Sequence, residues 1–304
     1  MSEKTQASAV EILDAPASEH GEGPVWDPTH EVLHWVDLTR GVVHHLRGDD
    51  SWTADHFDTE VTALAPHVDG GLVAATSDGF AYVSEGRLHP LSNVLADRPD
   101  LRMNDGGCDR AGRFLAGSMA YDAAPHAGTL HRLDLDGQVT TLAENVTIPN
   151  GLDWSPDGSL LYFTDSGAQV VTAYDYDHGT GAMTGPRTFL DFASVTGEPD
   201  GLTVDSEGNL WVAVWDGWQV RCYDPEGQLL LEIAVPVQRP TSVAFGGPEL
   251  SDLFITTSRF GLSAAAVAAQ PAAGRLLRSR STAVGRSPDP CQVELTSIPT
   301  EEGR

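Results

Sequence analysis

The sequence predicts an all-β protein, a β-propeller of six blades with four antiparallel strands in each blade. Short runs of β-branched, aromatic and aliphatic residues recur along its 304 residues, and tight-turn sequences separate them. The units that these runs form repeat at intervals of 39 to 50 residues, close to the roughly 40–50 residue period of propeller blades. Closing such units into a ring also protects the edges that an open sheet would expose.

Six strand-like runs mark the units, and each run follows a shorter strand that ends in a turn. The runs lie at residues 32–37, 71–76, 113–117, 160–165, 209–214 and 252–257. The clearest turns are DGG at 69–71, SPDG at 155–158 and DSEG at 205–208. Aligning the units places the start of each first strand at about residues 22, 61, 104, 150, 200 and 241.

The two ends of the repeat region complete the predicted domain. We expect a strand at residues 9–13 to close the ring by completing the last blade, and only the Ala-rich segment 262–269 to form a short helix. The predicted organisation is therefore a disordered N-terminus at 1–8, a single propeller domain at 9–280 and an irregular C-terminal tail at 281–304.

The composition restricts the partners and the compartment. With 18 basic and 44 acidic residues the formal net charge is −26, so nucleic acid and an anionic membrane surface would repel the chain. Its three distant cysteines make neither a disulfide framework nor a zinc motif, and its first residues lack the apolar core of a signal peptide. We therefore expect a cytoplasmic protein, a monomer or small homo-oligomer, with a small molecule as its partner.

The alignment of the units brings polar residues into one column. Equivalent positions of propeller blades lie on a ring around the axis, so the starts of the innermost strands converge at one mouth of the channel. The six positions of the column are Glu22, Val61, Asn104, Asn150, Asp200 and Thr241. A single Asn-Gly or Asp-Gly pair is usually a turn, but four strong oxygen donors in one column favour a binding site.

Carboxylate and amide oxygens without Cys or His are typical of a site for a hard divalent cation such as Ca²⁺, Mg²⁺ or Mn²⁺. Carboxylates packed around a narrow channel would be costly if no cation paired with them. The sequence therefore predicts a central metal-binding channel.

Six motifs that occur in order along the chain extend this prediction. They are EGPVW at 22–26, RMNDG at 102–106, AGRFLAGSM at 111–119, NGLDW at 150–154, YDYD at 174–177 and PDGL at 199–202. Over about residues 10–275 the chain resembles the gluconolactonase / regucalcin (senescence marker protein) / luciferin-regenerating enzyme family. The resemblance implies a six-bladed propeller that hydrolyses sugar lactones and holds one divalent cation, Ca²⁺ before Mg²⁺, Mn²⁺ or Zn²⁺.

The resemblance also implies roles for individual residues. Three positions match the metal ligands of the family: Glu22, Asn150 and Asp200. Asp200 also matches the general base, and Arg102 and Asn104 match residues that contact the substrate. Asp122 takes the place of a further substrate-contacting carboxylate, with one methylene fewer, and Tyr121 replaces a neighbouring acid. These two departures leave the identity of the sugar open.

The same residues support a mechanism on chemical grounds. A cation can polarise the carbonyl of a lactone, Asp200 can deprotonate an attacking water, and Arg102 can bind lactone hydroxyls or the departing carboxylate. We therefore predict a metal-dependent sugar lactonase, a carboxylic ester hydrolase that converts a pentono- or hexonolactone to the aldonic acid.

Two other functions stay open at the level of sequence. The same pocket could hydrolyse an organophosphate triester, since a Lewis-acid cation serves either electrophile, or the protein could be a non-catalytic calcium-binding regulatory propeller. The pair His44-His45 near the end of a strand is expected to be structural, because the surrounding sequence offers no partners for a metal site. The segment 175–181 is expected to be a hairpin turn.

Overall fold

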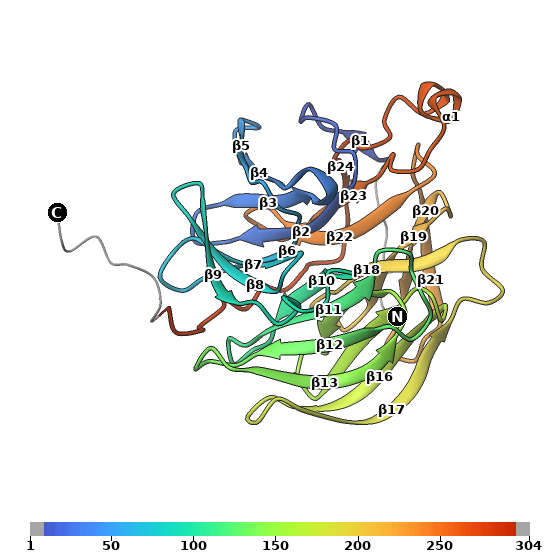
Figure 1. Ribbon diagram of the computed structural model, residues 1–304. Helices are drawn as coiled ribbons and strands as arrows, with labels where there is room; N and C mark the ends of the chain where they lie inside the picture. The colour runs from blue at the N-terminus through green and yellow to red at the C-terminus, as the bar shows by residue number, and fades with distance from the viewer. Residues whose placement is uncertain (1–8, 296–304) are drawn as a thin grey trace.

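The computed structural model describes residues 9–295, which form six four-stranded antiparallel sheets arranged around one axis (Figure 1). The predicted six-bladed propeller with four-stranded blades is therefore confirmed. The predicted disordered N-terminus at 1–8 and the last part of the predicted tail, 296–304, lie outside the described residues.

The first three blades follow one another along the chain. Blade 1 contains β2 (Gly21–Asp27), β3 (Val32–Asp37), the 3₁₀ turn η1 (Leu38–Arg40), β4 (Val42–Arg47) and β5 (Trp52–His56). Blade 2 contains β6 (Val61–Pro66), β7 (Leu72–Thr76), β8 (Phe80–Ser84) and β9 (Arg87–Ser92). Blade 3 contains β10 (Leu101–Cys108), β11 (Phe114–Ala120), β12 (Gly128–Leu133) and β13 (Val139–Val146).

The last three blades repeat the arrangement. Blade 4 contains β14 (Pro149–Trp154), β15 (Leu160–Asp165), β16 (Val170–Asp177) and β17 (Ala182–Asp191). Blade 5 contains β18 (Glu198–Val204), β19 (Leu210–Trp215), β20 (Gln219–Tyr223) and β21 (Leu229–Ala234). Blade 6 contains β22 (Pro240–Gly246), β23 (Asp252–Thr257), β24 (Leu277–Arg280) and β1 (Glu11–Ile12). The hairpin between β16 and β17 contains the turn expected at 175–181.

The first strand of the chain closes the ring, as expected for residues 9–13. β1 pairs antiparallel with β24 at the outer edge of blade 6, and the backbone N–H of Leu13 donates to the carbonyl of Leu276 at 3.0 Å. The short helix expected at 262–269 is α1 (Ala264–Ala269), which begins after Ser263, whose hydroxyl accepts from the N–H of Ala266. No helix within residues 9–295 is long and apolar enough to cross a membrane.

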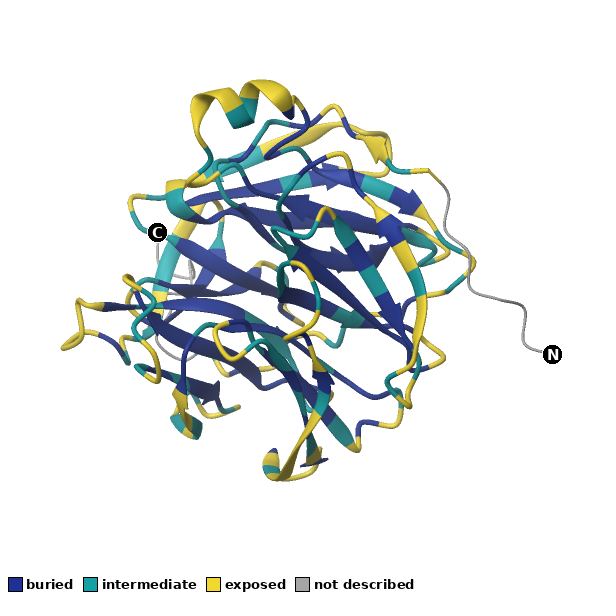
Figure 2. Ribbon diagram, turned by 90° about the vertical axis from the view of Figure 1, so that its right-hand side faces the viewer, coloured by how far each residue is buried: buried dark blue, intermediate teal, exposed yellow. Residues whose placement is uncertain are grey.

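The hydrophobic core lies between neighbouring blades. Figure 2 shows buried residues along the inner strands, while the outer strands and hairpins are more exposed. Aromatic side chains of adjacent blades meet edge to face: Phe80 with Phe114 at 6.0 Å, and Trp211 with Phe245 at 5.5 Å. Such pairs add about 0.5–1.5 kcal/mol each to the stabilisation from buried area, so they help fix each blade against the next.

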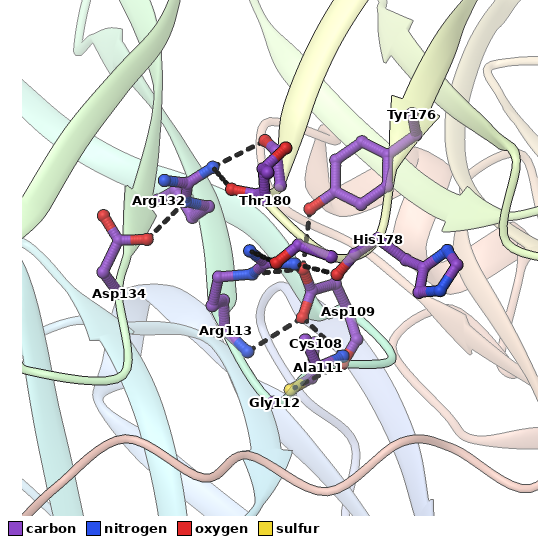
Figure 3. Close-up of polar contacts among 12 residues, drawn as sticks. Cys108, Asp109, Ala111, Gly112, Arg113, Arg132, Asp134, Tyr176, His178 and Thr180 are labelled. Atoms are coloured by element: carbon purple, nitrogen blue, oxygen red, sulfur yellow. Dashed lines mark hydrogen bonds and ion pairs between the residues drawn. The ribbon is translucent and has the colours of Figure 1, made fainter.

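A buried polar network ties blade 3 to the hairpin of blade 4 (Figure 3). The fully buried Asp109 accepts hydrogen bonds from Arg113 Nε and from the hydroxyl of Tyr176, both at 2.7 Å. Arg113 and Arg132 donate in turn to backbone carbonyls of the hairpin, at His178 and Gly181. Because every charge in this network has a partner, its burial is compatible with a stable fold.

Residues 281–295, the described part of the expected tail, run along the end of the propeller away from the predicted mouth. The backbone N–H of Cys291 donates to Pro66 at 2.7 Å, and that of Gln292 donates to Gly112 at 2.9 Å. Arg286 Nη2 donates to Asp153 Oδ1 at 2.6 Å. Residues 286–289 line one side of a channel cavity of about 130 Å³, so this segment covers the far end of the channel.

Candidate functional site

Apart from Asp122, the predicted site residues lie near the starts of innermost strands, and each of the six innermost strands carries a β-bulge there. The register of β2 against β3 shifts between Glu22 and Val25, and that of β18 against β19 shifts between Pro199 and Leu202. Equivalent shifts interrupt the innermost strands of the other four blades. A bulge changes the direction of a side chain relative to regular alternation and often accompanies a functional site.

The glycines that follow Asn150 and Asp200 are not in turns. Gly151 lies inside β14 and Gly201 lies inside β18. A Cβ at Gly151 would collide with the backbone N of Leu202, and one at Gly201 would collide with the side chain of Ser242. The Asn-Gly and Asp-Gly pairs therefore exist because neighbouring innermost strands approach too closely for a side chain.

A chain of hydrogen bonds fixes the two amides of the site. Asn104 Nδ2 donates to Asn150 Oδ1 at 2.7 Å and to the carbonyl of Pro149 at 2.7 Å. Asn150 Nδ2 donates to Ser166 Oγ at 2.7 Å, and Ser166 Oγ donates to the carbonyl of Pro199 at 2.5 Å. The network leaves one lone pair of Asn150 Oδ1 for a further contact, because a carbonyl oxygen accepts two.

Three carboxylates are buried close to these amides. Glu22, Asp105 and Asp200 are 6 %, 9 % and 4 % exposed. Burial, with the charge of Glu22 as the second cause, raises the pKa of Asp105 to about 7. Burial and the charges of Glu22, Asp105 and Glu198 raise the pKa of Asp200 well above its ordinary value. Asp200 Oδ1 is buried and has no hydrogen-bond partner among residues 9–295.

These residues fit a hard divalent cation. An unpartnered buried carboxylate oxygen, a second carboxylate and an amide oxygen held by its neighbours are the oxygen donors that Ca²⁺ prefers. Within residues 9–295 no group of three or more His, Cys, Asp or Glu side chains is placed to hold a metal ion. Glu22, Asn150 and Asp200 would therefore hold the cation as an open set, one ligand of which is an amide.

Arg102 lies beside this set at the mouth of the channel. Its Nη1 donates to Asn104 Oδ1 at 2.6 Å and to the carbonyl of Met103 at 2.8 Å. Burial lowers the pKa of its guanidinium, and the nearby negative charges of Glu60 and Glu22 offset part of this lowering. The orientation of Arg102 is thus fixed by the same Asn104 that orients Asn150, so three of the predicted residues form one hydrogen-bonded unit.

The loop that carries Asp122 is more exposed. The carboxylate of Asp122 accepts from the N–H of Ala124 at 3.0 Å, and the residue lies at the surface just after β11. Its neighbour Tyr121 donates its hydroxyl to Glu60 Oε2 at 2.8 Å, and burial with the Glu60 contact raises the pKa of Tyr121 to about 12. This hydrogen bond connects the loop to blade 2.

Sequence reasoning missed several residues of the mouth. Asp105 directly follows Asn104, and the RMNDG motif displayed it without assigning it a role. His20 lies 3.4 Å from Glu22 Oε1, and its ring contacts those of Trp215 and Phe260 at 5.6 and 5.4 Å. Only the closed ring brings these residues of blades 1, 5 and 6 together, so their spacing in the sequence carried no signal.

Comparison with known proteins agrees with this architecture. A family model described as the SMP-30/Gluconolactonase/LRE-like region matches residues 20–259. A pentonolactonase of Haloferax volcanii is 40 % identical over 242 residues, which cover 78 % of this chain and 81 % of that protein. A regucalcin of Danio rerio is 37 % identical over 277 residues, which cover 87 % and 92 %. The solved structure of a calcium-binding protein, regucalcin, from Agrobacterium tumefaciens has a TM-score of 0.90 and 29 % identity, covering 95 % of this chain and 98 % of that one.

Proposed function

Because the chain belongs to the SMP-30/gluconolactonase/LRE-like family, as its motifs predicted, we propose that it is a metal-dependent sugar lactonase. It hydrolyses a pentono- or hexonolactone to the aldonic acid, and so is a carboxylic ester hydrolase. The observation that carries the proposal is the buried, unpartnered Oδ1 of Asp200 beside Glu22 and the fixed amide of Asn150.

The proposed cofactor is one divalent cation, with Ca²⁺ first. Glu22, Asn150 and Asp200 hold it through oxygen atoms, which favours Ca²⁺, Mg²⁺ or Mn²⁺ over softer ions. The calcium-binding description of the Agrobacterium regucalcin supports Ca²⁺. When bound, the cation supplies a Lewis acid that polarises the lactone carbonyl.

Asp200 acts as the general base. Its carboxylate accepts a proton from a water while the water oxygen bonds to the carbonyl carbon of the lactone. The ring C–O bond then breaks, and the proton passes to the ring oxygen, which becomes a hydroxyl of the aldonic acid. Positioned general bases contribute typically about 10²–10⁴-fold, and the buried position of Asp200 holds its carboxylate in one orientation.

Arg102, Asn104 and Asp122 orient the sugar. The planar guanidinium of Arg102 can bind two oxygens of the substrate at once, and Asn104 holds that guanidinium at 2.6 Å. The Oδ1 atom of Asn104, which accepts from Arg102, has a second lone pair that can accept from a substrate hydroxyl. Asp122 can accept from a further hydroxyl, since its loop is exposed at the surface and its side chain is held only by the N–H of Ala124.

The first experiment is a pH-indicator assay of lactone hydrolysis by protein stripped of metal. The stripped protein receives Ca²⁺, Mg²⁺, Mn²⁺ or Zn²⁺ in separate samples. Each sample is tested on pentono- and hexonolactones, with a no-enzyme control for spontaneous hydrolysis. Activity restored by one cation supports the proposal and identifies metal and sugar together. If the metal-bound protein hydrolysed none of the lactones, the proposal would be contradicted.

A pair of variants tests the role of Asp200. Asp200→Asn is expected to lower kcat by about 10²–10⁴-fold. The control is Asp136→Asn, because the exposed carboxylate of Asp136 accepts from the backbone N–H of Gln138, a hydrogen bond that an asparagine can keep. Full lactonase activity of Asp200→Asn with metal bound would refute the mechanism.

The two alternative functions are outcomes of the same experiments. Turnover of a phosphotriester that exceeds every lactone would favour an organophosphate hydrolase in this pocket. Saturable cation binding without hydrolysis across the panel would favour a calcium-binding propeller. The joint fixing of Arg102 and Asn150 by Asn104 favours catalysis over the calcium-binding propeller, since a cation buffer has no use for an oriented guanidinium.

A further inference from the structure

Two of the three cysteines, far apart in the sequence, come together at the far end of the channel. Cys108 is the last residue of β10, and Cys291 lies in residues 281–295, which we call the C-terminal strap. Both pack into one hydrophobic cluster of blades 2 and 3, in which Cys291 is fully buried and Cys108 is half-buried. Cys222 of β20 belongs to a different cluster, that of blades 5 and 6.

Backbone hydrogen bonds hold the strap in place on both sides of Cys291. The N–H of Cys291 donates to the carbonyl of Pro66 at 2.7 Å, and its carbonyl accepts from the N–H of Val68 at 3.0 Å. The N–H of the next residue, Gln292, donates to the carbonyl of Gly112 at 2.9 Å. The strap passes so close to this glycine that a Cβ at Gly112 would lie 2.5 Å from the Cβ of Gln292. Cys291 is therefore anchored between blade 2 and the turn that follows β10.

The two thiols meet at this turn. Sγ of Cys108 lies 3.6 Å from the carbonyl oxygen of Asp109, and Sγ of Cys291 lies 3.4 Å from the carbonyl oxygen of Gly112. The N–H of Gly112 donates to the carbonyl of Asp109 at 2.9 Å, so both carbonyls belong to one tight turn, which Figure 3 shows with Cys108 beside it. The thiol of Cys108 donates a hydrogen bond to the sulfur of Cys291. Two sulfur atoms on anchored backbones are thus already in contact, as the formation of a disulfide requires.

We propose that Cys108 and Cys291 are a redox modification site, at which an intramolecular disulfide locks the C-terminal strap to the innermost strand of blade 3. The oxidant is a small hydroperoxide such as hydrogen peroxide. Cys108 lines the channel cavity of about 130 Å³, which has room for a molecule of this size, and Asp289 of the strap lines the same cavity. A reversible disulfide of this kind senses oxidants in a compartment that otherwise keeps thiols reduced.

The surroundings give the two sulfurs different roles. The hydrogen bond from Cys108 lowers the pKa of Cys291, and the backbone N–H groups of Val293 and Gln292 act in the same direction. Burial raises the pKa of Cys108, so Cys108 keeps its proton as the donor of the pair. Cys108 is therefore the sulfur that a peroxide in the cavity reaches, and Cys291 is the thiolate that attacks it afterwards.

The modification takes place in two steps. The sulfur of Cys108 bonds to one peroxide oxygen as the O–O bond breaks, and the departing hydroxide takes the thiol proton and leaves as water, so that a sulfenic acid remains. The thiolate of Cys291 then attacks this sulfur: the S–S bond forms, the S–O bond breaks, and the hydroxide leaves as a second water with the proton that Cys291 had released. The two thiols have lost two electrons, which one peroxide has gained.

The test treats reduced full-length protein with hydrogen peroxide, alkylates the remaining thiols in denaturant and maps the tryptic peptides by mass spectrometry. The peptide 103–110, which contains Cys108, should be linked to the peptide 287–304, which contains Cys291, and dithiothreitol should separate them. One of the three thiols, that of Cys222, should remain free. The matched control Cys222→Ala should form the same link, whereas Cys108→Ser should keep both of its thiols.

Thermal unfolding tests the locking role. The disulfide closes a loop that contains blades 4, 5 and 6, so the chain-entropy model predicts that the Tm of the oxidised protein exceeds that of the reduced protein by up to roughly 8 °C. Oxidant should leave the Tm of Cys108→Ser unchanged. A linked wild-type protein with the Tm of the reduced form would refute the locking of the strap.

Three results of the peptide map would overturn the modification site itself. They are three free thiols after treatment with peroxide, a Cys108 oxidised to sulfinic acid without a link, and a disulfide that joins two chains. Because Cys108→Ser could fail to fold, the map of the wild-type protein decides the question without it. None of these measurements depends on lactone turnover, so their outcome is independent of the proposed function.

Discussion

The buried carboxylates predict that the metal-free protein loses stability as the pH rises. Asp105 is the clearest case, because burial and the charge of Glu22 raise its pKa from 3.8 to about 7. One pKa unit corresponds to about 1.4 kcal/mol, so ionising this group in the folded metal-free protein costs up to about 4 kcal/mol. The informative perturbation is Asp105→Asn, which keeps the hydrogen bond from the N–H of Gly106 and removes the charge.

The sign follows from proton linkage. Between pH 3.8 and about 7 the unfolded chain has released the proton of Asp105 while the folded, metal-free protein retains it. The stabilisation from this group is therefore full below its unfolded pKa and is lost as the pH rises through the folded value. Other aspartates with lowered pKa values, such as Asp157 at about 2, act in the opposite direction at lower pH, so the difference between variant and wild type isolates Asp105.

Thermal unfolding in chelator at a series of pH values from 4.5 to 8 provides the assay. At about 2.1 cal/mol/K of unfolding entropy per residue, 4 kcal/mol corresponds to roughly 6 °C for a chain of this length. The Tm of Asp105→Asn should exceed that of the wild type by a margin that grows to about this size near pH 7, and Ca²⁺ should reduce the margin. A constant difference between the two proteins across this range would refute the reasoning.

Three other variants probe single hydrogen bonds, one in the buried network between blades 3 and 4 and two at the site. Tyr176→Phe removes the hydroxyl that donates to Asp109 and should lower the free energy of unfolding by about 2 kcal/mol in urea, with lactone turnover unchanged. Asn104→Ala frees the amide of Asn150 and should raise the Kd for Ca²⁺ roughly tenfold or more in a calorimetric titration. Arg102→Lys loses the planar donor group and should lower kcat/KM for lactones by about 10- to 100-fold, with Ca²⁺ affinity retained.

The blades could be predicted because each is a local unit with its own strands and turns. The repeat placed the first strands at about residues 22, 61, 150 and 241, and the observed strands begin at Gly21, Val61, Pro149 and Pro240. The closing strand was also readable, since an unpaired apolar strand before the first unit has one edge left to join. The position of residues 281–295 could not be predicted, because this segment makes scattered hydrogen bonds to distant parts of the chain and its sequence has no periodic pattern.

The candidate site was readable only where the repeat itself displays it. Glu22, Asn104, Asn150 and Asp200 stood out because they share one column. The direction of their side chains depends on the bulge in each innermost strand. The only sign of this bulge in the sequence is a Gly after Asn or Asp, which sequence analysis alone reads as a turn. Residues such as His20 and Ser166 contact the column from other strands, so only the three-dimensional ring assigns them to it.

The geometry of the ring makes its axis the natural place for a cation. The six innermost strands converge on the axis without pairing with one another, and glycines such as Gly151 let them approach closely. Carboxylates that point toward the axis are therefore buried away from bulk water. At the far end the chain covers the axis with residues 286–289, and Arg286 binds Asp153 there. At the mouth no basic side chain of the described residues pairs with Asp200, and its Oδ1 has no partner among them. The guanidinium of Arg102 stands nearby but is held by Asn104. The difference between the two ends favours a channel that is closed by protein at one end and completed by a cation and substrate at the other.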